Sequence, residues 1–571
     1  MSSRRWFLSF LSMILAVAVL VAAFNFAIDP FGVFGDRFFD RYSLNLANNP
    51  KIAKIAYLDK YFSEYDSYII GGFGANAYSV DMLNLYTDGK FYNLAMPDVG
   101  MYDIFNTASY VIDNYDVKNI VLPITLLEIV NYKSKNSVLT DNMHVKAEGG
   151  SDYLFYLKYL YANPDYSLEK MKNYFNDSFL PKEFNSYTER TGAYDRSVFD
   201  IEPISDAYQY LAYNTSFSEA DYSYQRMEFL EECMECISAI KEKCEAKGIS
   251  FALILSPEFY LQKSRYSDEE LGIYMRALSN ITDFWDFSFS PVSSDARYFY
   301  DAHNMRNALG SMLLAKIYSD DRRYSPDDFG YYVTALNVEE RIAALNQNAA
   351  LLLDNSQDVP ILRYSYVDDE FFSEHVEALS SAGYETIMID DILDYVGEGK
   401  ELPEKPIIIT IDDCSKEGLN TAYSILMKYN FRAEVFIGNL NRNAMNSINT
   451  MSSILTAEIY SSGFVNNRGV YNKNEEIRYV NEIKREINKT RSIFYDNLEY
   501  TPFAFVYNRD EYSVLNEVIL HNANILVTFV GNNAENNTII KGIPQSLKAL
   551  TRINVTASLT PEELLNMINN R

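Results

Sequence analysis

A short apolar run that ends in two adjacent carboxylates constrains the fold more than any other feature of this chain. The run from Ile407 to Ile411 is rich in β-branched residues, follows Pro406 and stops at Asp412 and Asp413. This pattern predicts a buried parallel strand, and side chains at the carboxyl end of such a strand point into the functional cleft of an α/β fold. Paired carboxylates repel each other there, so they usually catalyse a reaction or bind a cation. The alternative is a solvated strand end that caps a helix.

Five blocks in the last part of the chain accompany this strand or contain it: Pro360 to Tyr364, Phe372 to Leu379, Leu402 to Ile437, Phe503 to Tyr507 and Leu550 to Val555. In their order, these blocks resemble the polysaccharide deacetylase (NodB-homology) family. Members of that family fold as a distorted (β/α) barrel, so the resemblance implies an α/β barrel over residues 359–571.

The resemblance also implies roles for individual residues. In the family, the first aspartate of the pair is the general base, and the second holds a divalent metal together with two histidines. Asp412 and Arg552 therefore stand at catalytic positions, and Asp413 stands at a metal-binding position. One carboxylate is too few for a catalytic zinc ion, which normally has three protein ligands.

The histidines that complete the family's metal site are absent from their expected places. They should fall near Val470 and Asn474, and the chain has no histidine between His375 and His521. Both of those are interpreted as structural histidines, so the metal site is expected to be incomplete, with no tightly bound cofactor. A hydrolase with an altered site stays open, because oxygen ligands for a harder ion remain nearby: Asn466, Asn467, Asn474, Glu475 and Glu476.

The N-terminus predicts a membrane anchor over residues 1–28. Arg4 and Arg5 precede a nearly continuous apolar segment from Trp6 to Ile28, which is long enough to span a bilayer as a helix. The positive residues favour a cytoplasmic N-terminus, so we expect a single-pass protein of the cell membrane with the chain after about Asp29 outside the cytoplasm. A cleaved signal peptide is the alternative, although the apolar segment is longer than such a peptide needs.

Charge and cysteine content narrow the class of protein further. The net charge of −28 argues against nucleic acid or anionic lipid as a partner. The 47 tyrosines and 35 phenylalanines select no glycan by themselves, because most such rings are buried in cores. Cys233 and Cys236 have CxxC spacing within a helical pattern from Met227 to Lys247, which predicts buried cysteines rather than a redox motif.

Residues 29–335 alternate strand-like and helical runs, which predicts a three-layer α/β/α domain. The glycine-rich turn from Gly71 to Ala75 fits neither the dinucleotide-binding fingerprint nor the P-loop fingerprint. The strand candidates are Ser67 to Ile70, Lys118 to Leu122, Phe251 to Leu255 and Phe284 to Phe287.

The domain contains four short motifs: Asp66 to Gly71, Phe91 to Ala95, Lys118 to Leu122, and Tyr300 to Arg306 with Gly310. These motifs resemble SGNH hydrolases, whose relatives accompany O-acetylation of cell-wall and exported polysaccharides. That family uses a serine after the first strand, with a late Asp and His three residues apart. Gly72 or Phe73 stands at the serine position here. Asp301 matches the late Asp, but Asn304 stands where the His belongs and His303 is one residue early. The resemblance therefore implies a degenerate site.

Residues 336–358 are expected to form a connecting helix and a linker between the two domains. The chain thus combines an anchor with two carbohydrate-modifying folds that both lack key catalytic residues. This favours a non-catalytic protein that binds cell-surface polysaccharide, with envelope proteins as further partners and no nucleic acid. The alternatives are an active carbohydrate N-deacetylase with an altered metal site and a structural envelope scaffold.

Overall fold

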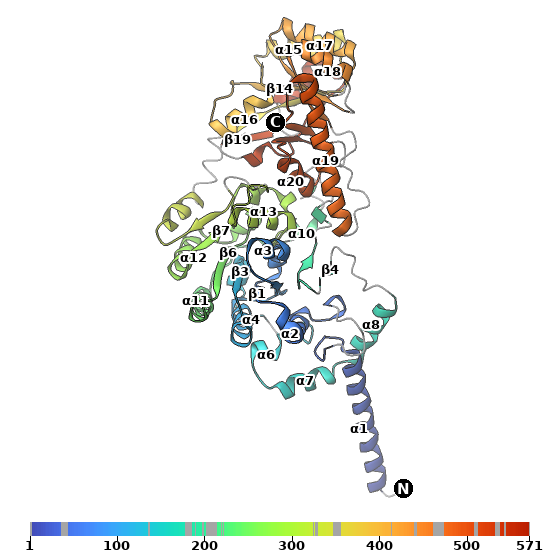
Figure 1. The fold of residues 1–571 in the computed structure, drawn as a ribbon, viewed down its shortest axis with the longest axis vertical. Helices are drawn as coiled ribbons and strands as arrows, with labels where there is room; N and C mark the ends of the chain where they lie inside the picture. Colours follow the sequence, from blue (N-terminus) through green and yellow to red (C-terminus); the bar gives the residue numbers. More distant parts are fainter. Residues whose placement is uncertain are drawn as a thin grey trace.

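The computed structural model is an elongated α/β molecule from which one helix projects (Figure 1). Its two sheets lie one above the other along the long axis, and the C-terminus lies at the end opposite the projecting helix. The structure describes residues 3–35, 44–134, 138–176, 186–188, 190–196, 199–200, 210, 214–218, 220, 222–323, 325, 329–345, 356–412, 414–438, 442–460, 473–507, 512–530, 537–541 and 544–569.

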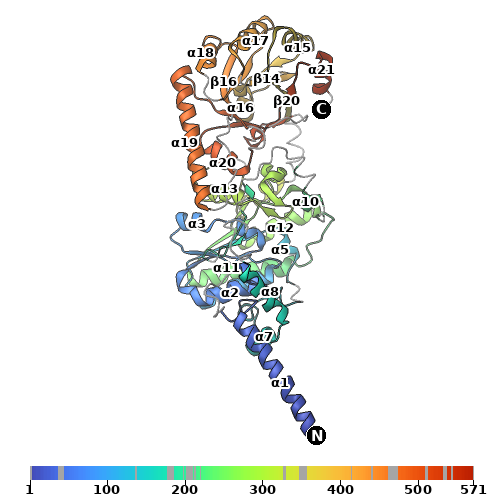
Figure 2. The same ribbon diagram turned by 90° about the vertical axis from the view of Figure 1, so that its right-hand side faces the viewer.

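The projecting helix is α1 (Ser3–Ile28). It is exposed over most of its length and becomes buried only near its end, from Asn25 onward (Figure 2). Among the described residues, α1 is the one helix long and apolar enough to cross a membrane. The apolar N-terminal helix predicted from the sequence is therefore present, and its length suits a membrane span or a signal anchor.

The first sheet has six strands in the order β10-β7-β6-β3-β1-β2. Neighbouring strands are parallel except at the edge, where β10 runs antiparallel to β7. All four strand candidates from the sequence occur in this sheet. The bounds are β1 (Ser67–Ile69), β2 (Phe91–Asn93), β3 (Asn119–Ile124), β6 (Ser250–Leu255), β7 (Phe284–Asp286) and β10 (Tyr331–Val333).

Helices cover both faces of this sheet because successive strand residues point to opposite sides. Tyr68 and Ile70 join one core cluster, and Ile69 joins the other. The first cluster takes in α2 (Pro50–Tyr61), α4 (Met101–Asn114), α11 (Leu230–Lys247) and α12 (Asp268–Ile281). The second takes in α3 (Val80–Tyr86), the 3₁₀ helix η3 (Phe73–Ala77) and α13 (Asn307–Ile317).

Shorter elements surround the first sheet. The helices are α5 (Leu126–Val130), α6 (Val145–Glu148), α7 (Asp152–Leu160), α8 (Pro164–Phe175) and α10 (Thr215–Ser218). Two hairpins consist of β4 (Ser186–Tyr187) with β5 (Tyr194–Asp195), and β8 (Phe299–Asp301) with β9 (Asn304–Met305). The helix predicted around the CxxC motif is confirmed, since Cys233 and Cys236 are buried thiols within α11.

The second sheet is a curved parallel sheet. Its main path runs β18-β17-β16-β15-β14-β12-β20, and β13 pairs with β14 beside that path. A parallel bridge joins Phe529 of β18 to Leu550, which lies shortly before β20, and so brings the two ends of the sheet together. The bounds are β12 (Ile361–Tyr364), β13 (Glu385–Thr386), β14 (Pro406–Asp412), β15 (Ala433–Ile437), β16 (Leu455–Tyr460), β17 (Ala504–Val506), β18 (Val527–Phe529) and β20 (Ile553–Val555), with a separate pair β11 (Ser356–Val359) and β19 (Asn537–Ile540).

Helices surround the outer face of this sheet, and the curvature encloses the inner face. The helices on the outer face are α15 (Asp369–Ser381), α17 (Lys416–Lys428), α18 (Arg442–Thr450), α19 (Lys473–Leu498), α20 (Val514–Asn522) and α21 (Pro561–Asn569). Helix α16 (Ile389–Glu398) instead packs on the inner apolar cluster. The apolar cluster on the inner side includes Ile361, Ile408, Phe436, Val506 and Phe529. A parallel α/β sheet of the kind expected for the C-terminal part is therefore present.

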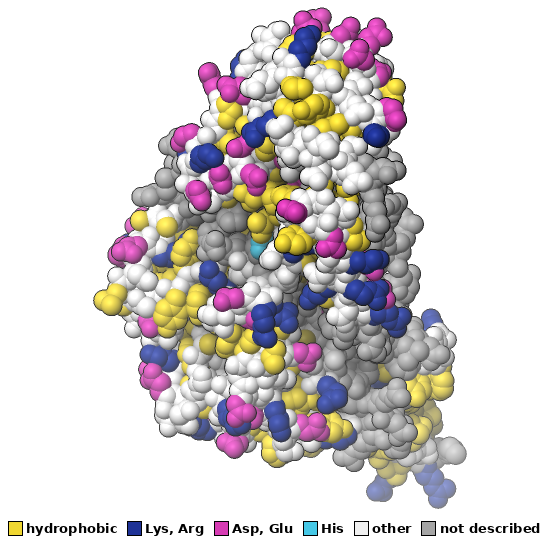
Figure 3. Space-filling model, turned by 45° about the horizontal axis from the view of Figure 1, so that its top comes forward, with side chains coloured by type: hydrophobic (Ala, Val, Ile, Leu, Met, Phe, Trp, Pro, Cys, Tyr) yellow, Lys and Arg dark blue, Asp and Glu magenta, His cyan; other side chains and the backbone are white. Residues whose placement is uncertain are grey.

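The two sheet regions are in contact with each other. Helix α13 contacts α20, and Val518 of α20 packs on the second core cluster of the first sheet (Figure 2). Residues 338–345, the start of the predicted connecting helix, are helical and bury Val338 and Ile342 in the first sheet's core. Figure 3 shows acidic and basic side chains intermixed over the face that it presents.

Candidate functional site

Asp412 is the last residue of β14 and is surrounded by cationic partners. It is only 4% exposed. Its Oδ1 accepts a hydrogen bond from Nη1 of Arg552 at 2.6 Å, and its Oδ2 accepts one from Nη2 of the same residue at 2.9 Å. Nε of Arg363 donates to Oδ2 at 2.6 Å. Two guanidinium groups therefore hold one carboxylate.

The order of the strands explains this cluster. β12 lies between β14 and β20, and Arg363 of β12 is in register with Thr410 of β14. Arg552 directly precedes β20 and also donates to Oγ1 of Thr410 at 3.1 Å. Because alternate residues share one face of a strand, Thr410 and Asp412 point to the same side. The bidentate contact with Arg552 then sets the orientation of the Asp412 carboxylate.

The described residues around Asp412 do not fit a divalent metal ion. Both oxygens of the carboxylate already accept hydrogen bonds from Arg363 or Arg552, and these two positive charges repel a further cation. Within the described part of the chain, no three His, Cys, Asp or Glu side chains are grouped so that they could hold a metal. Asp413 and residues 461–472 lie outside the described residues.

The two histidines nearest in sequence to the expected metal site contribute to packing. His375 lies on α15, where its Nε2 is 2.8 Å from the carbonyl oxygen of Leu559. His521 lies on α20, with Nδ1 3.0 Å from Nζ of Lys548. Burial and the neighbouring Lys548 charge lower the pKa of His521. Both histidines contact partners other than Asp412, as their interpretation as structural residues requires.

One exposed aromatic ring lies at the same edge of the sheet. Tyr366 follows β12 by two residues and is 61% exposed. Its ring is nearly parallel to that of Phe371, with centroids 6.2 Å apart. Strands β12 and β14 are parallel neighbours. Tyr366 therefore lies just beyond the carboxyl end of β12, beside the carboxyl end of β14 where Asp412 lies. Sequence reasoning did not select Tyr366, because only its exposure distinguishes it from the other tyrosines.

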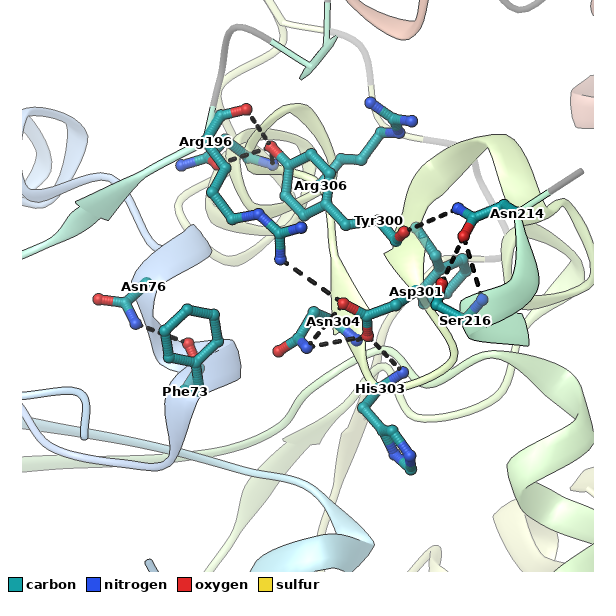
Figure 4. A network of polar contacts seen from close by, with 12 residues as sticks. Phe73, Asn76, Arg196, Asn214, Ser216, Tyr300, Asp301, His303, Asn304 and Arg306 are labelled. Carbon is teal, nitrogen blue, oxygen red and sulfur yellow. Dashed lines mark hydrogen bonds and ion pairs between the residues drawn. The ribbon is translucent and has the colours of Figure 1, made fainter. Parts of the chain in front are cut away.

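The second candidate site, in the first domain, is the hairpin formed by β8 and β9. Oδ1 of Asp301 accepts hydrogen bonds from the backbone N–H groups of His303 and Asn304 and from Nδ2 of Asn304, each at 2.9 Å. Arg196 adds an ion pair to Asp301 at 3.6 Å. The His303 ring points away from this cluster (Figure 4). The Asp301 carboxylate therefore contacts the side chain of Asn304, whereas His303 reaches it only through its backbone N–H group.

The hairpin lies beside the turn that follows β1, where the resemblance places a serine. Strand β9 contacts η3, which starts at Phe73 directly after Gly72. The space beside Gly72 is occupied by Glu128, because a Cβ atom at position 72 would lie 1.8 Å from Oε1 of Glu128. Burial raises the pKa of Glu128. The structure thus brings the two predicted segments together but puts no nucleophilic side chain at Gly72.

Buried carboxylates elsewhere were not anticipated from the sequence. Glu434 of β15 and Glu458 of β16 are almost completely buried. Burial raises the pKa of Glu434 to about 8, and raises that of Glu458 as well. In the first domain, burial raises the pKa of Glu258 to about 8. The signal that could have revealed the first two is a single acidic residue inside an otherwise apolar strand.

Comparison with known proteins assigns a family to part of the chain. The model of the family described as polysaccharide deacetylase matches residues 399–525. No curated protein matches the chain. The chain therefore contains a polysaccharide deacetylase-family domain, and this part of the resemblance is confirmed.

Several solved deacetylase structures resemble this chain. The Streptococcus pyogenes deacetylase PplD, in complex with acetate, is 17% identical, with 37% of this chain and 99% of that chain covered and a TM-score of 0.32. A de-N-acetylase from Aggregatibacter actinomycetemcomitans is 16% identical, with 37% and 100% covered and a TM-score of 0.31. A polysaccharide deacetylase from Bacillus cereus is 15% identical, with 42% and 72% covered and a TM-score of 0.30.

Proposed function

We propose that this chain is a membrane-anchored, extracytoplasmic protein that binds a cell-surface polysaccharide at the carboxyl edge of its second sheet without hydrolysing it. Helix α1 anchors the chain, and the polysaccharide deacetylase-family domain supplies the binding surface. The absence of any histidine between His375 and His521 carries the proposal, because the metal site of the family needs two histidines after the aspartate pair.

Tyr366 and Arg363 supply the chemistry that sugar binding needs. The exposed face of a tyrosine ring stacks on the apolar face of a sugar, and a guanidinium group donates hydrogen bonds to sugar hydroxyls. Tyr366 is exposed, and the Arg363 side chain is 22% exposed although one end contacts Asp412. Both lie on or just beyond β12, so one sugar unit can contact both.

A binding measurement tests this proposal. We expect the purified full chain in detergent to bind N-acetylglucosamine oligomers and release no acetate from them. Tyr366→Ala should weaken binding about tenfold, equivalent to about 1.4 kcal/mol, because it removes the stacking surface. Tyr495→Ala is the matched control, since Tyr495 is 60% exposed on α19 outside the site. Equal affinities of the two variants would overturn the proposed site.

A working hydrolase is the second candidate. Asp412 is held rigidly by Arg552, and a general base must be held in this way. In this case Asp412 would act as the general base for the attacking water, and Asp413 with nearby Asn or Glu side chains would hold an ion that polarises the substrate. The discriminating assay is metal content combined with acetate release from the same oligomers. Loss of release in Asp412→Asn, with a stoichiometric metal in the parent chain, would establish this candidate instead.

The first domain is proposed to be an SGNH-like domain without hydrolase activity. Gly72 has no nucleophilic side chain, and Asn304 replaces a base as the partner of Asp301. Its proposed contribution is to present the polysaccharide deacetylase-family domain above the membrane. Envelope proteins remain candidate partners for its surface.

A further inference from the structure

Helix α7 exposes an apolar face close to the base of the molecule. Tyr153 and Leu154 are 72% and 64% exposed, and Tyr161, just beyond the helix end, is 50% exposed. Leu154, Leu157 and Tyr161 recur at intervals of three and four residues, and Tyr153 is four residues before Leu157, so these positions share one side of the helix. A soluble domain gains nothing by exposing several large apolar side chains together.

The next helix, α8, also exposes large apolar side chains. Leu168 is 54% exposed and Phe175 is 72% exposed. We call α7 and α8 together, from Asp152 to Phe175, the collar. Both helices lie next to the end of α1 where it joins the body of the molecule (Figure 1).

The collar is fixed to α1 by buried polar contacts. Nδ2 of Asn25 donates to the carbonyl oxygens of Leu160 and Ala162 at 3.0 and 2.7 Å. Oδ1 of Asn25 accepts a hydrogen bond from Oγ of Ser167 at 2.7 Å. Because Asn25 is fully buried, these contacts give α1 and the collar a defined relative position.

The length of α1 places the collar at a membrane surface. The apolar stretch from Trp6 to Phe24 spans about 28 Å at about 1.5 Å per residue, close to the thickness of the hydrocarbon layer of about 30 Å. Asn25 follows this stretch directly, Asp29 lies four residues further on, and both contact the collar. The hydrocarbon layer would therefore end at the level of α7 and α8.

We propose that the collar is a second membrane contact, with its apolar face immersed in the outer headgroup layer of the bilayer that α1 spans. This inference rests on the proposed anchoring by α1. Tyrosine side chains are enriched at membrane–water interfaces, and an amphipathic helix that lies in the interface buries leucine and phenylalanine side chains on its apolar face. The contact fixes the tilt of the body relative to the membrane, and so sets the height at which the second sheet is presented.

A lipid surface is a better occupant than a protein partner because α7 and α8 contact the end of α1, the helix that is long and apolar enough to cross a membrane. The collar carries Asp152, Asp165 and Glu169 as well as lysines, so it does not select anionic lipid. A neutral phosphatidylcholine bilayer is therefore the appropriate probe.

Spin labels on the full chain in phosphatidylcholine nanodiscs test the proposal. Single cysteines replace Leu154, Phe175, Val17 and Met427, and the four native cysteines are all buried, so labelling is selective. Val17 reports on α1, and Met427 is a matched apolar control that is 52% exposed on α17, at the end of the molecule far from α1. We expect oxygen collisions to exceed nickel-chelate collisions at Val17, Leu154 and Phe175, and the reverse at Met427.

The outcomes separate the collar from the anchor. If the Val17 label lies in lipid while the Leu154 and Phe175 labels behave like the Met427 label, anchoring by α1 is supported and the membrane contact of the collar is rejected. Water-accessible Leu154 and Phe175 labels would also be expected if a protein partner, which the discs do not contain, covers the collar in cells. That result would reject a lipid contact of the collar. If the Val17 label is itself accessible to water, the anchoring fails and the collar inference fails with it.

Discussion

Glu128 occupies the space that a side chain at position 72 would need. Its Oε2 accepts hydrogen bonds from the backbone N–H of Thr125 at 2.7 Å and from Oγ1 of Thr125 at 2.5 Å. These contacts fix the carboxylate at the start of α5. Backbone conformation does not require the glycine, because Gly72 has a φ of −70°, which any residue adopts. Packing against Glu128 is the reason for its small size.

Restoring a serine at position 72 should therefore destabilise the protein rather than create a hydrolase. We expect Gly72→Ser to lower the free energy of unfolding by about 1–3 kcal/mol, because the buried Glu128 must move. Combining it with Glu128→Ala should recover part of this loss, giving a coupling of about 1 kcal/mol in a double-mutant cycle. Thermal melting of the four proteins measures the effect.

Gly74→Ser is the matched control for this cycle. Gly74 lies in the same 3₁₀ helix, and a Cβ atom there meets nothing within 4 Å. Additive effects of Gly72→Ser and Glu128→Ala, or equal losses at positions 72 and 74, would show that Glu128 does not control the space beside Gly72.

Individual site residues were only partly predictable. Asp412 was selected because an acidic residue at the end of an apolar run is visible locally, and the structure confirms that it ends a buried strand. Its partner Arg363 was not, because the two residues are 49 apart in sequence and meet only through the pairing of β12 with β14. Thr125 and Glu128 did carry a local signal, the capping-box spacing, which is typical of a helix start.

At the scale of elements, Glu434 links a strand to a helix on the inner side of the second sheet. It lies on β15, and its Oε1 accepts a hydrogen bond from the backbone N–H of Ile389 at the start of α16, at 2.9 Å. Its Oε2 has no hydrogen-bond partner. Ionisation would place a charge in a buried site, so the protonated form is favoured in the folded state.

This link should make stability depend on pH. The pKa of Glu434 is raised from the ordinary 4.5 to about 8. The folded state therefore holds a proton that the unfolded state has released, and stability falls as pH rises from about 4.5 to about 8. Glu434→Gln, which stays neutral, should remove this part of the loss, so that its melting temperature declines less than that of the parent between pH 5 and pH 9.

Glu385→Gln, an exposed change on the neighbouring β13, is the control for general charge effects. Melting curves of the parent and both variants are compared at each pH. Parallel profiles for the parent and Glu434→Gln would contradict the assignment, because every other titrating group is common to the two proteins.

At the scale of the whole molecule, an aromatic contact joins the two sheet regions. The guanidinium group of Arg297 lies 4.9 Å from the centre of the Tyr512 ring, and Asp295 holds it by hydrogen bonds of 2.8 and 2.9 Å. Tyr512 is fully buried and precedes α20, whereas Arg297 belongs to the first domain. A buried cation over an aromatic face is a stabilising contact that depends on both domains being in place.

Removing this contact should uncouple the domains. Tyr512→Ala should cost about 3–5 kcal/mol, as large-to-small changes of buried aromatic residues do, and should split a single calorimetric transition into two. Tyr495→Ala, an exposed change on α19, should leave the transition unchanged. A single cooperative transition in Tyr512→Ala at nearly the parent temperature would mean that other contacts hold the two regions together.

Local features of the sequence determined a large part of this protein. The apolar helix α1, the strands β1, β3, β6 and β7, and the strand that ends at Asp412 all follow from hydrophobic patterns within a few residues, which is the range over which such patterns act. The polysaccharide deacetylase-family domain also follows from blocks in a fixed order, and residues 399–525 match that family.

Only the tertiary structure decided what surrounds the chemically important residues. Arg552 is 140 residues from Asp412, and the two meet because β12 places β20 beside β14. Glu128 likewise faces Gly72 because the fold brings two distant segments together, and α7 and α8 lie beside the end of α1 because they dock there. Such contacts depend on strand order, register and helix docking, which no local pattern specifies. The sequence thus determined the elements and the family, and the fold determined their partners.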